Sequence, residues 1–271
     1  MTQFPTRSQQ LVDLADERII ILDGAFGTML QSLNLTEDDF RGSRFKSHGT
    51  NLRGCNDVLC LTCPQAVAGI HRQYLEAGAD IIETNSFNAN AISLADYALS
   101  EYAAEINLAA AEIARAEADE YFKATGRRAY VAGSVGPTNK SLTMAVTLDD
   151  DIDWDTMVAA YTTQMTALIK GGADLLIIET IFDTLNAKAA IYAAKTAFET
   201  TGTTLPVILS VTLTESGRTL SGQSLEAFAA TVAHANPFAV GLNCGFGIEG
   251  MATHIATLQP LVPRVSVYAN A

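Results

Sequence analysis

Short apolar runs alternate with longer amphipathic stretches along almost the whole chain. This alternation is typical of repeated βα units, which assemble into a parallel sheet. Because the short runs are almost continuously apolar, we expect strands that are covered on both faces. Seven runs are predicted as strands: Arg18–Gly24, Ala79–Asn85, Ala129–Gly136, Ala173–Thr180, Pro206–Leu213, Phe238–Cys244 and Arg264–Ala271.

The stretches between these runs carry the start and stop signals of helices. The clearest is Pro64–Ala77, which begins with proline and is followed by Gly78, a residue type that ends helices well. Four further helices are predicted in the same way: Ala89–Thr125, Asp155–Lys170, Thr184–Glu199 and Ser224–Ala235.

Seven strands are one short of a closed (β/α)₈ barrel, and the sequence ends on the seventh. The short loops and the regular order of strands and helices favour a TIM-type barrel that is truncated after strand seven, rather than an open seven-stranded sheet. No stretch reads as a linker or as low-complexity sequence, so we expect one domain over residues 1–271 that lacks strand eight.

Composition and charge narrow the classes of function. The chain has 271 residues, of which 48% are hydrophobic and 17% charged, so a large core can be buried. Its net charge of -13 disfavours binding to nucleic acid or to an anionic membrane. No apolar run approaches the roughly 20 residues that span a bilayer, and Met1–Gln10 has no signal-peptide apolar region. Four cysteines do not suggest a disulfide framework, so we expect a cytoplasmic protein.

Polar residues close the predicted strands at their carboxyl ends, where the active site of a parallel barrel lies. Three of them are carboxylates, Asp23, Glu83 and Glu179. Carboxylates at one rim can bind an ammonium group or act as general acid and base, although each alone could be an ordinary solvated charge. The turn that contains Gly24 and Gly27 offers backbone N–H groups to a carboxylate. This rim would therefore suit an amino acid as substrate.

Cys244 follows the sixth predicted strand in the sequence Gly-Leu-Asn-Cys-Gly. A cysteine there could be a nucleophile, a zinc ligand or a packing residue, and no HExxH or CxxC motif accompanies it. Cys55, Cys60 and Cys63 have a C-x4-C-x2-C spacing that also occurs in plant-type ferredoxins. Because the fourth cysteine is far downstream, incidental cysteines are the favoured interpretation of that spacing.

Several long motifs together resemble one known group of proteins. The chain resembles the N-terminal homocysteine-binding, zinc-carrying module of cobalamin-dependent methionine synthases, within the homocysteine S-methyltransferase family. Betaine–homocysteine and other homocysteine methyltransferases share the barrel and shorter versions of the motifs. The matching stretches are ILDGAFGTMLQ, DDFRG, EAGADIIETNSFNAN, VAGSVGPTN, GGADLLIIETIFDTLNAKAA, SGRTLSGQ and FAVGLNCGFG.

This resemblance implies roles for individual residues. In the family, three cysteines bind a zinc ion, and the first of them matches Cys244. The other two form an adjacent pair after strand eight, and this sequence has no adjacent cysteine pair. Asp23 and Glu179 match positions that hold the amino-acid group of the substrate. Three residues are second-line candidates for the same site: Glu83, Thr84 and Asn243.

The function that the resemblance implies is zinc-dependent activation of the homocysteine thiol, followed by methyl transfer from methylcobalamin to form methionine. No residue here is suited to hold a corrinoid, so methylcobalamin is expected on another domain or protein. The implied partners are the corrinoid-binding and folate-binding modules of methionine synthase.

Two other readings stay open. The chain could be a stand-alone homocysteine methyltransferase that uses a small donor such as betaine or S-methylmethionine. It could also be a non-catalytic subunit that binds a partner supplying strand eight, because the predicted edge at Arg264–Ala271 would otherwise be unpaired.

Overall fold

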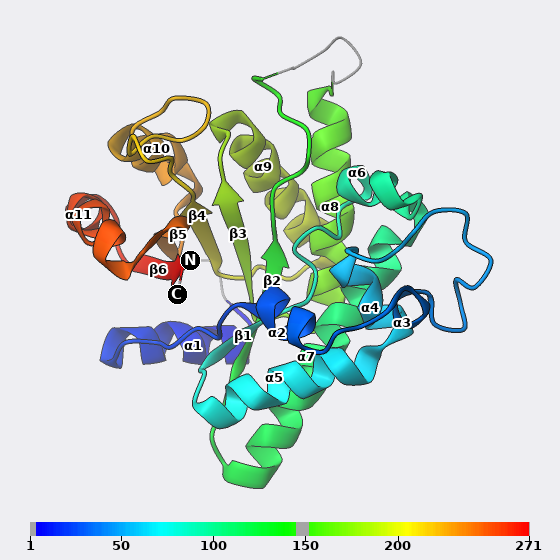
Figure 1. Cartoon of the computed structure of the whole chain (residues 1–271). Helices are drawn as coiled ribbons and strands as arrows, with labels where there is room; N and C mark the ends of the chain where they lie inside the picture. The colour runs from blue at the N-terminus through cyan, green and yellow to red at the C-terminus, as the bar shows by residue number, and fades with distance from the viewer. Residues whose placement is uncertain (1–3, 145–151, 271) are drawn as a thin grey trace.

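Six parallel strands form a single sheet in the computed structural model, which describes residues 4–144 and 152–270 (Figure 1). The strands lie side by side in the order in which they follow along the chain. All five neighbouring pairs are parallel, which is the arrangement that the alternating pattern predicts. The strands are β1 (Ile81–Glu83), β2 (Tyr130–Val135), β3 (Leu175–Ile181), β4 (Val207–Val211), β5 (Ala239–Gly247) and β6 (Val265–Asn270).

The sheet curls into a half-barrel with helices on its outer side, an α/β architecture consistent with a TIM-like barrel (Figure 1). Helices between strands run roughly along the sheet, and α8 and α9 pack against each other over β2 and β3. The helices are α1 (Thr6–Glu17), α2 (Phe26–Ser32), α3 (Glu37–Arg41), α4 (Leu59–Thr62), α5 (Pro64–Ala77), α6 (Ala91–Leu94), α7 (Ala103–Thr125), α8 (Trp154–Lys170), α9 (Thr184–Thr201), α10 (Leu225–Val232) and α11 (Ile248–Leu258).

The prediction of a first strand at Arg18–Gly24 is wrong. This segment forms a single parallel bridge between Leu22 and Ile81, and the Asp23 N–H donates to the Ile81 carbonyl over 2.9 Å. A strand needs a continuous ladder of backbone hydrogen bonds, and here the segment meets only the short β1. The Ile19 side chain is 83% exposed, which a strand covered on both faces would not allow. Of the last predicted strand, Ala271 lies outside the described residues.

The prediction for Pro64–Ala77 is confirmed residue for residue as α5, which ends at Gly78 with a left-handed φ of 108°. By contrast, Ala89–Thr125 is not one helix. Its first part is the short α6 followed by two 3-10 turns, and Ala98 has a left-handed φ of 53° that interrupts the helix. The side chain of Asn107 ties this irregular part to α7 by donating to the Ala89 carbonyl over 2.7 Å.

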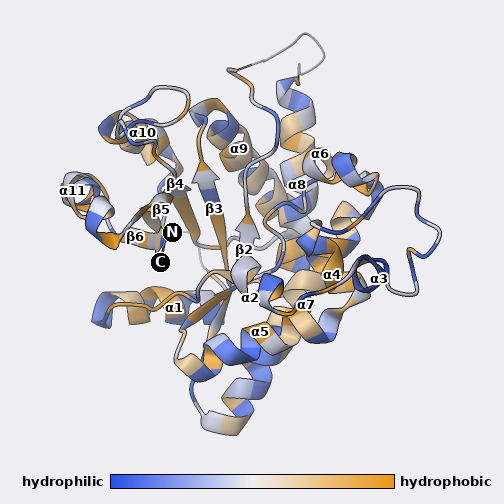
Figure 2. Cartoon of the chain, in the orientation of Figure 1, coloured by the Kyte–Doolittle hydropathy of each residue, from blue (hydrophilic) through white to orange (hydrophobic). Residues whose placement is uncertain are grey.

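The core has one layer inside the curled sheet and one between the sheet and its outer helices. In Figure 2 the strands are coloured mostly as hydrophobic residues, and the helices carry both hydrophobic and hydrophilic residues. Inside the sheet, the fully buried Leu11 of α1 packs with strand residues such as Ile81 and Leu175. Helix α1 therefore covers the amino ends of the strands, and the arrows of β2 and β3 point away from it (Figure 1).

Helix α1 is fixed there by Asp174, the residue just before β3. Arg7 forms an ion pair with the Asp174 carboxylate at 2.8 Å, and the Ser8 hydroxyl donates to its carbonyl over 2.7 Å. Arg115 of α7 binds the second carboxylate oxygen at 2.7 Å. These contacts hold α1 and α7 against the amino end of β3.

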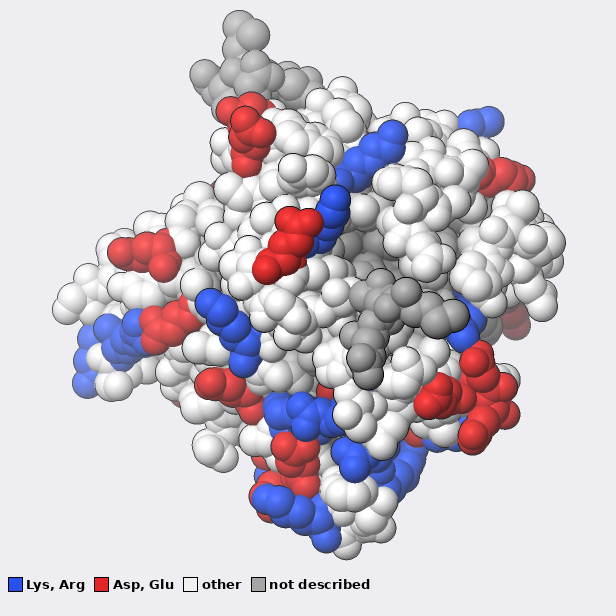
Figure 3. Space-filling model, turned by 180° about the vertical axis from the view of Figure 1, so that it is seen from behind, with Lys and Arg blue, Asp and Glu red and all other residues white. Residues whose placement is uncertain are grey.

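The surface carries both signs of charge in close proximity. Figure 3 shows acidic and basic side chains intermingled over the face opposite to the view of Figure 1. Exposed ion pairs such as Arg72–Glu117, at 2.8 Å, and Lys123–Glu120, at 2.6 Å, contribute to this mixture. Within the described residues, no helix combines the length and the apolar composition that crossing a membrane requires.

Candidate active site

Three carboxyl groups meet at the carboxyl ends of the strands. Asp23 lies between the Leu22 bridge and α2, Glu83 ends β1, and Glu179 lies near the end of β3. The three residues are 9%, 9% and 8% exposed. The backbone N–H of Glu83 donates to the Asp23 carboxylate over 2.8 Å, and the Ser134 hydroxyl donates to Glu179 over 2.5 Å. The fold thus brings together three carboxyl groups from distant parts of the chain, and Asp23 and Glu83 alone are 60 positions apart.

Burial makes it difficult for all three groups to be ionised at once. Burial raises the pKa of Asp23 well above its usual range, and the negative charge of Glu179 raises it further. The same two causes raise the pKa of Glu83 well above its usual range, and burial raises the pKa of Glu179 to about 7. One oxygen of Asp23 (Oδ1) and one of Glu83 (Oε1) are buried without a hydrogen-bond partner among the described residues. A cation placed there would gain partners and relieve the repulsion.

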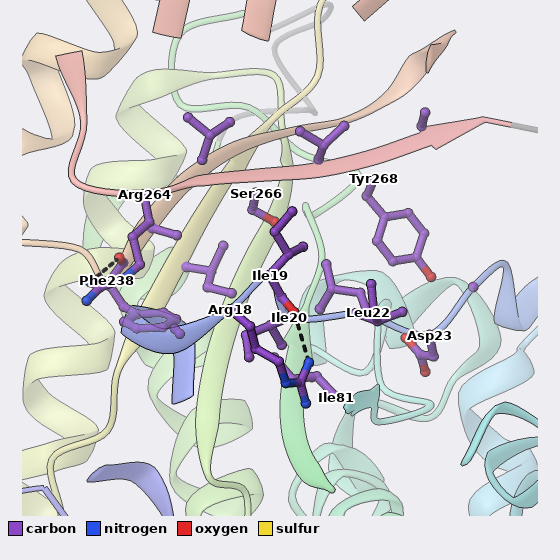
Figure 4. A pocket seen from close by; sticks show the side chains of 18 of the residues that line it. Arg18, Ile19, Ile20, Leu22, Asp23, Ile81, Phe238, Arg264, Ser266 and Tyr268 are labelled. Atoms are coloured by element: carbon purple, nitrogen blue, oxygen red, sulfur yellow. Dashed lines mark hydrogen bonds between the residues drawn. The ribbon is translucent and has the colours of Figure 1, made fainter. Parts of the chain in front are cut away.

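Two tyrosines border this cluster, and neither was a predicted site residue. Tyr268 of β6 points its hydroxyl toward Asp23 (Figure 4). Burial raises the pKa of Tyr268, and the neighbouring Glu83 and Asp23 charges raise it further. Tyr74 of α5 also lies near Asp23, and burial together with the Asp23 charge raises its pKa. Periodicity places Tyr268 on a strand, but only the parallel register of β6 shows that it faces the site.

The structure gives the predicted glycines and Thr84 different surroundings. A side chain at Gly24 would lie 2.9 Å from the Tyr74 ring, so this position needs glycine for packing. At Gly27, in the first turn of α2, the nearest atom to such a side chain is 3.9 Å away, so packing does not require glycine there. The Thr84 hydroxyl is already used inside the sheet: it accepts from the Ser134 N–H over 2.9 Å and shares a 2.6 Å contact with the Ser86 hydroxyl.

Asn243 and Cys244 end the regular part of β5. Asn243 is 2% exposed, and its side chain reaches both β3 and β4. Cys244 is exposed and lines the same cavity as Asp23. Cys244 has a left-handed φ of 58°, and the sheet register shifts between Asn243 and Gly247. Bulges of this kind re-aim side chains next to active sites.

The cavity opens beside these residues, between β6 and the Ile19–Asp23 segment. Its volume is about 1250 Å³, and its walls include both strand-end residues and apolar side chains of β6. Figure 4 shows Ser266 and Tyr268 of β6 on one side and Leu22 and Asp23 on the other. The cavity runs from Arg18 and Arg264 at the amino ends of the strands to Asp23 and Cys244 at the carboxyl ends, so only one end of it borders the carboxyl cluster.

The described residues do not form a zinc site by themselves. A tetrahedral zinc site requires at least three protein ligands. Within residues 4–144 and 152–270, no group of three or more His, Cys, Asp or Glu side chains is arranged to hold a metal ion. Cys244 is the one cysteine among the residues that line the cavity, whereas Cys55 and Cys60 are buried in the core. Burial raises the pKa of Cys55 to about 12, so its thiol stays protonated.

Comparison with known proteins identifies the family of this chain and solved structures with a similar fold. Residues 20–271 match the family model described as homocysteine S-methyltransferase. The metallated form of the homocysteine methyltransferase MmuM from Escherichia coli has a TM-score of 0.75 and 24% sequence identity, with 94% of this chain and 85% of that chain covered. Its oxidised form has a TM-score of 0.78 and 24% identity, with 99% and 87% covered.

Proposed function

We propose that this chain, which belongs to the homocysteine S-methyltransferase family, binds homocysteine through its ammonium group at Asp23, Glu83 and Glu179 and transfers a methyl group to its sulfur. The observation that carries the proposal is the pair of buried, unpartnered carboxylate oxygens, Asp23 Oδ1 and Glu83 Oε1. Buried polar groups without partners are rare in folded proteins and call for a functional explanation. An ammonium group has three N–H donors and a positive charge, so it supplies what these oxygens lack.

Binding of an ammonium group would also offset the unfavourable electrostatic energy of the three buried carboxyl groups. A cation within about 4–6 Å favours the ionised form of each carboxyl, which opposes the effect of burial. Asp23 and Glu83 would therefore lose protons as the substrate enters. The Tyr268 hydroxyl, which faces Asp23, can donate to the carboxylate or to the substrate, and we place it in the binding site.

The finer proposal concerns activation of the thiol. A free thiol, with a pKa of about 8.5, is mostly protonated at neutral pH. A bound zinc ion would supply the positive charge that stabilises the thiolate form of the sulfur, which is the form that attacks a methyl group. Cys244 would be one ligand, and the others would have to come from outside the described residues.

We further propose methylcobalamin as the methyl donor, held by another domain or protein, with the corrinoid-binding and folate-binding modules of methionine synthase as partners. This part rests on the resemblance of long motifs such as ETNSFNAN and FDTLNAKAA. With it we propose a role in methionine biosynthesis in the cytoplasm. A small donor such as betaine or S-methylmethionine is the competing proposal, and a donor assay with purified protein separates the two.

Calorimetric titration with L-homocysteine tests the binding site. Asp23→Asn and Glu179→Gln should each weaken binding at least about tenfold, the effect of losing a hydrogen bond to a charged group. Glu215→Gln is the matched control, because Glu215 is an exposed carboxylate on the loop after β4, and it should bind as the wild type does.

A second titration uses 4-mercaptobutanoate, which keeps the thiol and the carboxylate of homocysteine but lacks the ammonium group. It should not bind measurably. Equal affinity for both compounds would show that the carboxyl cluster does not recognise the ammonium group, and the proposal would be wrong.

A further inference from the structure

The side-chain amide of Asn243 uses its full hydrogen-bonding capacity within the protein. Its Oδ1 accepts from the Thr180 N–H over 2.9 Å and from the Ser210 hydroxyl over 2.6 Å. Its Nδ2 donates to the Thr180 hydroxyl over 2.7 Å and to the Cys244 sulfur over 3.2 Å. A primary amide offers two N–H donors and two carbonyl lone pairs, so none is left for a ligand. The side chain thereby joins β3, β4 and β5 at their carboxyl ends.

Two of these partners have a backbone conformation that residues with a Cβ atom rarely adopt. Thr180 has a φ of 55° and Cys244 a φ of 58°. The left-handed region is especially unfavourable for a β-branched residue such as Thr180. Such conformations persist where the surroundings over-determine them, and they gather at functional sites. The Asn243 amide binds both the N–H and the hydroxyl of Thr180, so it fixes that conformation directly.

The conformation of Cys244 sets where its sulfur lies. Gly245, which follows it, is also left-handed with a φ of 73°, and a side chain there would approach the Leu213 carbonyl to 2.7 Å. The chain therefore turns sharply after Asn243, and Cys244 is exposed to the cavity rather than buried in β5. The Nδ2–sulfur contact is the one hydrogen bond that the Cys244 side chain makes within the described part of the chain.

We infer that Asn243 is a positioning residue that aims the Cys244 sulfur into the methyl-transfer cavity, and that it does not itself contact the substrate. The inference deepens the proposed function and rests on it for the meaning of the site. Its geometric basis is independent: a saturated amide, two left-handed residues held beside it, and a donor directed at the sulfur. It changes the role of Asn243 from the predicted substrate contact to a support of Cys244.

Alkylation of Cys244 measures this role directly. The wild type, Asn243→Ala and Asn243→Asp are treated with iodoacetamide at pH 8, and the modification rate of each cysteine is followed by peptide mass spectrometry. The partly exposed Cys63 serves as an internal reference. Ser210→Ala is the matched control, because it removes one partner of the amide and leaves the Nδ2–sulfur contact.

The Asn243 amide holds the turn at Thr180 and donates to the Cys244 sulfur, so without this amide the sulfur is no longer held toward the cavity. The ratio of the Cys244 rate to the Cys63 rate should therefore fall about fivefold or more in Asn243→Ala, the effect of one lost hydrogen bond. It should fall to a similar extent in Asn243→Asp, because an ionised carboxylate has no N–H to donate to the sulfur. Ser210→Ala should stay within about twofold of the wild type, since the donor remains. A ratio in Asn243→Ala equal to or above the wild-type ratio would overturn the inference.

Calorimetric titration with L-homocysteine separates this inference from the proposed function. Asn243→Ala should lose less affinity than Asp23→Asn, which loses about tenfold or more. If Asn243→Ala loses as much as Asp23→Asn, then Asn243 contacts the substrate and the inference is wrong. If the wild type does not bind homocysteine, the proposed function fails, while the alkylation ratio still decides whether Asn243 positions Cys244.

Discussion

Replacing His71 with leucine should stabilise the protein, and the gain should grow as the pH falls. His71 of α5 is fully buried, and neither ring nitrogen has a hydrogen-bond partner among the described residues. Its ring lies 4.9 Å from that of Phe26, in an apolar setting that suits leucine. An unsatisfied buried polar group costs about 1–3 kcal/mol, so His71→Leu should raise the free energy of unfolding by about 1–2 kcal/mol at pH 8.

The pH dependence follows from the buried imidazole. Burial lowers the pKa of His71 from 6.5 to about 3. Below pH 6.5 the unfolded chain therefore binds a proton that the folded chain does not bind, and the wild type loses stability as the pH falls. Relative to pH 8, this loss should reach about 2 kcal/mol at pH 5 and about 3 kcal/mol at pH 4. Leucine does not bind a proton in the unfolded chain, so His71→Leu should not show this loss of stability at low pH.

Urea unfolding followed by circular dichroism at pH 8, 6.5, 5 and 4 measures this difference. The pKa of Glu179, which burial raises to about 7, acts with the opposite sign, because the folded state then holds a proton between pH 7 and 4.5 that the unfolded state has lost. Subtracting the wild-type curve from the His71→Leu curve removes that shared contribution. The exposed His234 gives the control, His234→Gln. A difference for His71→Leu that stays constant from pH 8 to pH 4 would refute the reasoning.

Two further substitutions test the pairing of β5 with β6 and the ion pairs at the amino end of β1. In Gly241→Ala the new methyl group would lie 2.3 Å from the Ser266 carbonyl oxygen. The β5–β6 pair should separate, at a cost of about 1–3 kcal/mol in chemical denaturation. Gly49→Ala, with no atom within 4 Å, should unfold as the wild type does. Burial alone would raise the pKa of Asp80, but hydrogen bonds, the largest from Arg18, lower it to about 2. Asp80→Asn should therefore cost about 2 kcal/mol at pH 7 in urea unfolding, and a cost that did not shrink between pH 4 and pH 2 would contradict this assignment.

The local pattern of the sequence determined the architecture to a large extent. Near-continuous apolar runs and helix end signals depend on neighbouring residues alone, which is why α5 could be predicted to the residue. The position of Glu83 and Glu179 at strand ends was also visible, because parallel strands carry their carboxyl ends to one rim, and Asp23 joins them beside the single Leu22–Ile81 bridge. The family motifs that pointed to homocysteine lie on those same strand ends.

Whether a segment forms a regular helix or strand depends on the residues that it contacts in the folded protein. Arg18–Gly24 has the composition of a strand, yet it forms one bridge, because a strand exists only through its partners. Ala89–Thr125 has helical composition, but Ala98 is left-handed, and tertiary contacts such as Asn107 to Ala89 hold the irregular start. Neither outcome has a signal in the local sequence.

The contacts in the site join pairs of residues that are far apart in the sequence, so the tertiary structure decided them. A strand pattern cannot show that Tyr268 faces Asp23, because the register between distant strands sets that contact. Nor can it show that Asn243 is saturated, since its partners Thr180 and Ser210 lie on two other strands. The sequence by itself named the chemical groups at the rim. Only the folded chain decided which of them are left without partners, because hydrogen bonding and burial depend on the distances between residues remote in sequence.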